Sequence, residues 1–67
     1  MKNQVLKEKR IRANTTQAEI AKKAGITDTG YLNYELGKRE PKVNTAIKIA
    51  KALGINDFQE FCSLWKY

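Results

Sequence analysis

The stretch TQAEIAKKAGITDTGYLNYEL, from Thr16 to Leu36, carries the signals of two short helices joined by a tight turn. Its first four residues form a capping box, in which the threonine hydroxyl accepts from the glutamate amide and the glutamate carboxylate reaches back. Gly25 stands where a left-handed residue closes a helix, and Thr27 is a suitable cap for the next helix. Two short helices around a three-residue turn that contains glycine predict a helix-turn-helix over about residues 17–36.

The apolar residues of this stretch are spaced so that they meet in one core. Ala21 lies where the two helices must cross closely, so a larger side chain there would clash. The second helix is expected from about Asp28 to Leu36, with tyrosines at inward positions that more often hold aliphatic residues. We expect the space between these helices and the rest of the core to be filled by Ile20, Ala24, Ile26, Tyr31 and Tyr34.

The tripeptide Asp28-Thr29-Gly30 also occurs at the active site of aspartic proteases. That chemistry needs two such loops, so that two carboxylates share a proton. The sequence predicts no strand beside Asp28, and the residues that follow it repeat with a helical period. The tripeptide therefore predicts no protease, and nothing else in the chain indicates an enzyme.

Helical patterns continue on both sides of the helix-turn-helix. We predict one helix over about residues 3–12 and another that Lys42 or Asn44 caps and Gly54 ends. A further helix is expected from Asn56, with the capping box NDFQ at its start. In the fourth helix we expect a buried stripe at helical spacing, formed by Val43, Ala46, Ile47, Ala50 and Leu53. The sequence thus predicts an all-α domain of five short helices over residues 1–67.

Charge is distributed unevenly along the 67 residues, whose net charge is +6. Residues 1–51 hold twelve of the thirteen Lys and Arg and five acids, about +7, whereas residues 52–67 amount to about −1. Such an imbalance favours a polyanionic partner, with nucleic acid ahead of membrane. The alternative is a basic surface that serves only solubility.

Other features of the composition limit the kind of protein. Cys62 is the only cysteine and there is no histidine, so we expect no disulfide within the chain, no metal site and no cofactor. We find no signal peptide and no apolar run long enough to cross a bilayer. We therefore expect a complete protein that works in the cytosol.

Several segments together resemble the DNA-binding domain of the lambda and 434 phage repressors and Cro, and of the related xenobiotic-response-element regulators. The resemblance covers about residues 4–61 without insertion. The segments that carry it are Leu6–Arg10, Thr16–Ala21, Ala24–Thr27, Tyr34–Arg39 with Pro41, and Ala46–Gly54. It implies a compact five-helix fold that binds double-stranded DNA.

The resemblance also implies residue roles. Arg10 and Glu35 match a largely buried ion pair between the first and third helices, which we interpret as structural. The positions expected to contact bases are Asp28, Thr29, Gly30, Leu32 and Asn33. The positions expected to contact phosphates are Thr16, Gln17, Lys38, Arg39 and Lys42.

Two of these positions depart from the family pattern. Asp28 stands where Gln or Arg is frequent; it can accept from cytosine N4 but repels phosphates, and its alternative role is only to cap the helix. Gly30 replaces a hydroxyl residue and would let the backbone approach DNA closely. Leu32 can lie on a thymine methyl group. The target sequence therefore cannot be copied from a relative.

The C-terminal segment 56–67 holds more large apolar residues than one small domain needs. We expect Phe58 to fill the domain's own core. Surplus apolar surface marks an interface, and repressors of this type bind two half-sites as symmetric dimers. We therefore expect a two-fold dimer contact formed by Phe61, Leu64 and Trp65. The alternative is that this segment docks on its own chain.

These observations predict a sequence-specific regulator of transcription, acting as a repressor. A homodimer would bind a palindromic operator, with helix 28–36 in the major groove of each half-site. The alternative function is a protein-interaction module of the same fold, such as an antitoxin or an adaptor.

Overall fold

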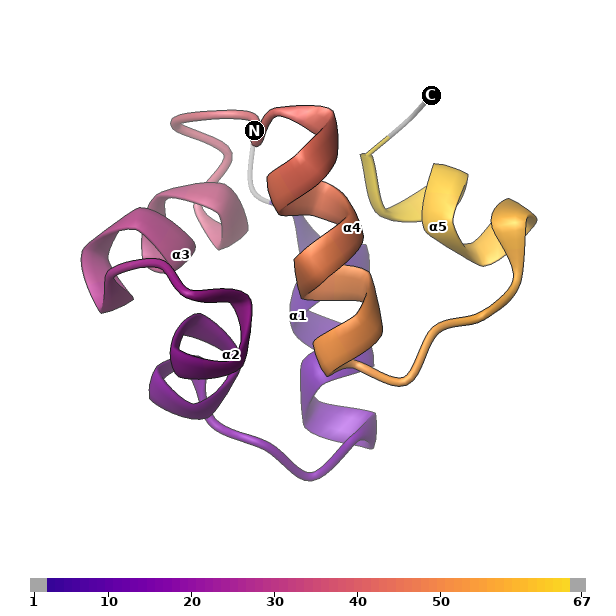
Figure 1. Ribbon diagram of the computed structural model, residues 1–67, viewed down its shortest axis with the longest axis horizontal. Coiled ribbons are helices and arrows are strands. Elements are labelled where there is room, and N and C mark those ends of the chain that lie inside the picture. Colours follow the sequence, from indigo (N-terminus) through magenta and orange to yellow (C-terminus); the bar gives the residue numbers. More distant parts are fainter. Residues whose placement is uncertain (1–2, 66–67) are drawn as a thin grey trace.

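The computed structural model describes residues 3–65, which form five helices and contain no strand. The helices are α1 (Gln4–Arg12), α2 (Gln17–Ala24), α3 (Asp28–Glu35), α4 (Val43–Ala52) and α5 (Phe58–Trp65) (Figure 1). The predicted all-α architecture is thus confirmed. Residues 66 and 67, the end of the predicted apolar segment, lie outside the described range. No helix within residues 3–65 is long and apolar enough to span a bilayer.

Local capping chemistry sets the start of the helix-turn-helix. The Thr16 hydroxyl accepts from the Glu19 amide, and the Glu19 carboxylate accepts from the Thr16 amide, so the predicted capping box is present. Gly25 closes α2 with φ at +71°, a conformation in which a Cβ would be strained. Thr27 then caps α3 by accepting from the Gly30 amide over 3.0 Å. These three features explain why the chain turns between α2 and α3 within three residues.

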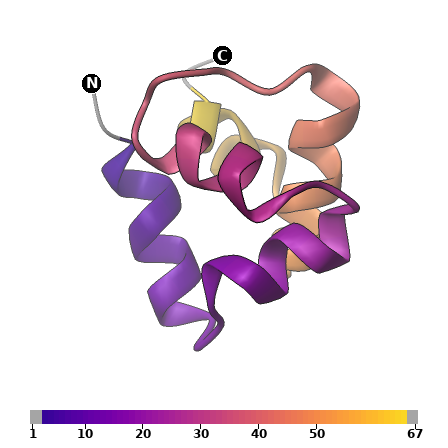
Figure 2. The ribbon, with the colours of Figure 1, turned by 90° about the vertical axis from the view of Figure 1, so that its left-hand side faces the viewer.

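The core lies where α2 packs against both α3 and α4. Figure 2 shows α2 and α3 together on one side of the molecule, with α5 behind them. Tyr31 is fully buried, as its inward position in the sequence predicted, and Tyr34 packs against the same cluster. The other buried apolar residues are Leu6, Ile20, Ala21, Ala24, Ala46, Ile49, Ala50, Leu64 and Trp65.

The buried face of α4 differs from the predicted stripe. Ile49 is buried, whereas Ile47 and Val43 are exposed. Both Ile47 and Ile49 fit a helical period with Ala46 and Ala50, so periodicity alone admits either face. Packing against α2 selects the face that carries Ile49. The predicted burial of Ile47 and Val43 is therefore wrong, and both aliphatic side chains lie on the surface.

The C-terminal segment docks on its own chain. Leu64 and Trp65 are buried in the core, and the Leu64 carbonyl accepts from Asn3 Nδ2 over 2.6 Å. Lys9 of α1 also pairs with Glu60 of α5, with 3.3 Å between Nζ and Oε2. This corrects the expectation that Leu64 and Trp65 face a partner, because little of either side chain is left to contact one.

Phe58 is the second correction in this segment. Its side chain is 75% exposed, whereas the sequence predicted it in the core. The reason is the start of α5, which begins at Phe58, two residues after the predicted Asn56. Asp57 is its cap, with Oδ1 accepting from the Gln59 amide over 3.3 Å. Phe58 therefore falls in the first turn, at the edge of the domain.

Candidate nucleic-acid interface

The outer face of α3 is formed by the residues predicted to contact bases. Asp28, Thr29 and Leu32 are exposed, and Gly30 and Asn33 are half-buried. The buried residues Tyr31 and Glu35 hold the opposite face against the domain. The helix is thereby fixed from behind, and its outer face is available to a partner.

Asp28 is free for such a partner because Thr27 provides the cap. The Thr27 hydroxyl accepts a hydrogen bond from the Gly30 amide, so Asp28 does not serve as the capping residue. Within residues 3–65 the Asp28 carboxylate makes no hydrogen bond or ion pair. A carboxylate at the positive end of a helix is stabilised there even without a protein partner.

Gly30 fits the same cap. A Cβ added at Gly30 would lie 3.0 Å from the Thr27 hydroxyl oxygen, closer than side chains ordinarily tolerate. A glycine in a helix costs up to about 1 kcal/mol relative to alanine. Here the missing side chain leaves room for the hydroxyl that starts α3. The unusual residue is therefore explained by local structure, apart from any contact with DNA.

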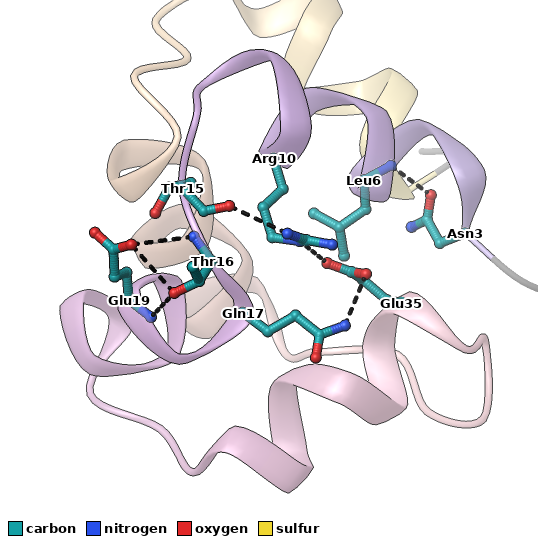
Figure 3. A network of polar contacts seen from close by, with 8 residues as sticks. All are labelled: Asn3, Leu6, Arg10, Thr15, Thr16, Gln17, Glu19 and Glu35. Carbon is teal, nitrogen blue, oxygen red and sulfur yellow. Dashed lines mark hydrogen bonds and ion pairs between the residues drawn. The ribbon is translucent and has the colours of Figure 1, made fainter.

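A polar network fixes the end of α3 to the rest of the domain (Figure 3). Arg10 Nε donates to Glu35 Oε2 over 2.7 Å, and the two side chains are 14% and 4% exposed. Arg10 Nη1 also donates to the Thr15 carbonyl over 3.1 Å, which ties down the loop before α2. The geometry is that of the largely buried structural pair that the resemblance implied. It joins α1 to α3 and to the chain entering the helix-turn-helix.

The network keeps Glu35 charged despite its burial. Burial by itself would raise the pKa of the Glu35 carboxyl, but the hydrogen bonds from Arg10 and Gln17 and the positive charge of Arg10 outweigh it, so the pKa is lowered. The hydrogen bond to Glu35 raises the pKa of Arg10. Burial, reinforced by the neighbouring carboxylate of Glu35, raises the pKa of Tyr31. The ion pair is therefore charged at neutral pH, with Tyr31 neutral beside it.

Gln17 joins this network from the start of α2. Its Nε2 donates to Glu35 Oε1 over 3.2 Å, a bond that the sequence did not indicate (Figure 3). The amide nitrogen carries two hydrogens, so a second donor remains available. The first backbone amides of a helix also lack intrahelical acceptors. Gln17 can thus be held by Glu35 and still present donors outward.

Thr16 is more heavily engaged than Gln17. Its hydroxyl accepts from the Glu19 amide over 3.1 Å and lies 3.2 Å from Glu19 Oε1. A phosphate contact through this hydroxyl would have to compete with the capping box. The exposed position of Thr16 nevertheless keeps it on the same surface as Gln17.

The loop after α3 carries three exposed cations, Lys38, Arg39 and Lys42. The Lys38 amide donates to the Asn33 carbonyl over 3.0 Å, which holds the start of the loop against α3. Pro41 is buried and anchors the loop's far end before α4. Figure 2 shows the loop running from the end of α3 to the start of α4. The positive charge of the loop therefore lies next to the C-terminal end of α3.

Comparison with known proteins decides the family. A family model described as helix-turn-helix matches residues 6–61. The chain belongs to this family, that of the lambda repressor and Cro.

The curated relatives of this helix-turn-helix protein carry regulator names. The phage CTXphi transcriptional repressor RstR of Vibrio cholerae is 42% identical over 78% of this chain and 46% of its own length. The uncharacterized regulator YqaE of Bacillus subtilis is 43% identical over 76% of this chain and 44% of its own length. The chain thus spans about half the length of these two.

A third relative is similar in size. The uncharacterized regulator MJ0272 of Methanocaldococcus jannaschii is 42% identical over 82% of both chains. No solved structure matches the chain significantly.

One contributor to the site of this helix-turn-helix protein was missed in the sequence. The Asn3 amide donates to the Glu35 carbonyl over 2.8 Å, so the residue that caps α1 also holds the end of α3. Asn before a helical pattern was a visible capping signal. Its contacts to α3 and α5 join residues far apart in the chain, and no local pattern reports them.

Proposed function

We propose that this protein is a transcriptional repressor that reads the major groove of double-stranded DNA with α3. The observation that carries the proposal is the outer face of α3. Among residues 3–65 its polar side chains have no protein partner, and the start of α2 and a loop of three exposed cations both adjoin the C-terminal end of α3. This combination provides base-reading groups together with donors and charges for phosphates.

The side chains on α3 suit particular base edges. Asn33 can form two hydrogen bonds with adenine, and Thr29 can bond to several bases. Asp28 can accept from cytosine N4, and its charge disfavours positions close to a phosphate. Leu32 can contact a thymine methyl group. Gly30 would allow the backbone to approach the DNA closely, since no side chain intervenes.

The groups around α3 are proposed to fix its register. Gln17 would donate to a phosphate from the start of α2, where the helix dipole favours an anion, with Thr16 beside it. Lys38, Arg39 and Lys42 would contact the phosphates next to the far end of α3. These contacts contribute affinity without sequence preference.

Two copies would occupy a palindromic operator in the cytosol, one half-site each. No cofactor and no catalysis is proposed. A second candidate is a protein-interaction module, favoured by the exposed side chains of Val43, Ile47 and Phe58. In that role the basic surface would be secondary, and DNA binding would be absent or independent of salt.

A salt titration of binding to random duplex DNA separates the two candidates. The repressor should lose affinity with a slope of about −0.9 per phosphate contacted in a plot of log affinity against log salt. Lys38→Ala should reduce the slope by about one contact, whereas Lys48→Ala, on the exposed face of α4, should leave it unchanged. Binding without salt dependence, or no binding, would refute the proposal.

A further inference from the structure

A small hollow lies where the starts of α1 and α2 meet the end of α3. It is lined by Gln4 and Lys7 of α1, Gln17 of α2, and Leu32 and Glu35 of α3, among others. The hollow measures about 100 Å³, well below the roughly 300 Å³ at which small-molecule sites begin, so it suits a single chemical group. Because Leu32 belongs to the outer face of α3, the hollow lies at the edge of the surface proposed to meet DNA.

Lys7 brings a positive charge to this hollow. Its side chain is exposed, and within residues 3–65 it forms no hydrogen bond or ion pair, since the ion pairs there are Lys9 with Glu60 and Arg10 with Glu35. Neither the core nor the proposed contacts of α3 and its loop use this residue. An exposed lysine alone is ordinary surface. Its place beside Gln17 and Leu32 is what indicates a role.

The carboxylate of Glu35 lines the hollow without opposing an anion there. Its Oε2 accepts from Arg10 Nε over 2.7 Å, so the guanidinium balances the charge of the carboxylate. Its Oε1 accepts from Gln17 Nε2 over 3.2 Å, and the side chain is only 4% exposed. Both oxygens are thus engaged, and the uncompensated charge at the hollow is that of Lys7.

Glu35 also fixes the amide group of Gln17 (Figure 3). One of the two hydrogens on Gln17 Nε2 is donated to Glu35, which leaves the second for an acceptor outside the domain. Lys7 of α1 and Gln17 of α2 therefore offer donors to one hollow from two helices. An ammonium and an amide donor together suit an anionic oxygen group such as a phosphate.

We propose that Lys7 and Gln17 hold the same DNA phosphate over this hollow, Lys7 from α1 and Gln17 from α2. The inference rests on the proposed function and adds α1 to the elements that contact DNA. It makes Lys7 a residue that fixes the register of α3 on the duplex, since phosphate contacts position a protein without reading sequence. Because Leu32 lines the same hollow, the phosphate belongs to a nucleotide beside the base pair that Leu32 contacts.

The first test measures the salt dependence of duplex binding by Lys7→Met, which keeps an apolar stem and removes the charge. The slope of log affinity against log salt should become shallower by about 0.9, and the affinity at low salt should fall about fivefold. Lys48→Met is the matched control, because it removes the same charge from the exposed face of α4, outside the hollow, and should leave the slope unchanged. Far-UV circular dichroism checks that each variant is folded.

The second test locates the phosphate. Each phosphate of a duplex selected by the wild type is replaced in turn by an uncharged methylphosphonate. At the shared phosphate this replacement should weaken wild-type binding about fivefold but Lys7→Met binding less than about twofold, because the cation that it faced is gone. Gln17→Ala should also respond less than the wild type at this same phosphate. A charge that acts only at a distance would not single out one position, so the scan separates contact from general attraction.

Three results would overturn the inference. One is a Lys7→Met variant with the wild-type slope. The others are a scan in which Lys7→Met responds like the wild type at every phosphate, and a scan in which Lys7→Met and Gln17→Ala lose their response at different phosphates. A wild type that does not bind duplex DNA overturns the inference together with the proposed function. If the wild type binds with salt dependence and Asn33→Ala alters base preference, but Lys7→Met behaves like Lys48→Met, only the inference about Lys7 fails.

Discussion

Replacing Arg10 by methionine removes the cation of the buried pair and keeps a side chain of similar length. Glu35 would then remain in the domain with a side chain only 4% exposed and without its charged partner. Removing one member of a buried ion pair costs about 3–5 kcal/mol, because the remaining charge is uncompensated. Gln17 still donates to Glu35 over 3.2 Å, which places the expected cost near the lower end, about 3 kcal/mol.

That cost is comparable to the whole stability of the domain. A core of this size supplies about 3–5 kcal/mol of net stability, so Arg10→Met should be close to its unfolding midpoint without denaturant. Urea unfolding followed by circular dichroism at a low, fixed protein concentration measures the loss. The matched control is the double variant Arg10→Met/Glu35→Leu, which removes both charges and should recover most of the stability.

The dependence on pH gives an independent check of the same reasoning. Without Arg10, burial dominates and the pKa of Glu35 should lie above its ordinary value of 4.5. The penalty for the unpaired carboxylate should therefore diminish as the pH falls through that raised pKa. If Arg10→Met lowers the free energy of unfolding by less than about 1 kcal/mol, as expected for an exposed pair, the structural role of the pair is refuted. So would a double variant no more stable than Arg10→Met.

Three further predictions concern recognition, the α3 cap and acid stability. Asn33→Ala should reduce preference at one base pair, whereas Lys38→Ala should weaken binding to all duplexes alike; affinities for a panel of single-site operator variants separate the two. Thr27→Ala should cost about 1 kcal/mol in thermal unfolding, and in that background Gly30→Ala should stabilise by up to about 1 kcal/mol, because the crowded hydroxyl is gone. In the wild type the pKa of Glu35 is lowered, so its contribution to the free energy of unfolding is complete above pH 4.5 and is lost as the pH falls through its pKa in the folded state. The Glu35→Gln variant should lack that part of the acid-induced loss of stability, which an acid titration measures.

Local chemistry made the helix-turn-helix predictable from the sequence. The capping box at Thr16, the cap at Thr27 and the left-handed Gly25 act within a few residues, and all three are present. Which face of an outer helix is buried was less predictable. On α4 a period of 3.6 allows the stripe with Ile47 or the one with Ile49, and only the neighbouring helix decides between them.

Contacts between distant parts of the chain could not be inferred from any local pattern. Gln17 and Glu35 are 18 positions apart and Asn3 and Leu64 are 61 apart, yet both pairs are hydrogen-bonded. The first hydrogen bond holds the start of α2 against the end of α3. The second hydrogen bond ties the end of α5 to the start of α1, whereas Phe58 at the other end of α5 is its exposed large apolar residue.

The central claim, that α3 and its flanking groups contact DNA, is tested most directly by NMR. A duplex is first selected by the protein from a random pool and then added to labelled protein while amide shifts are recorded. The account predicts the largest changes at the start of α2, along Asp28–Asn33 and in the loop 38–42. Changes confined to α4 and α5, with α3 unaffected, would contradict it.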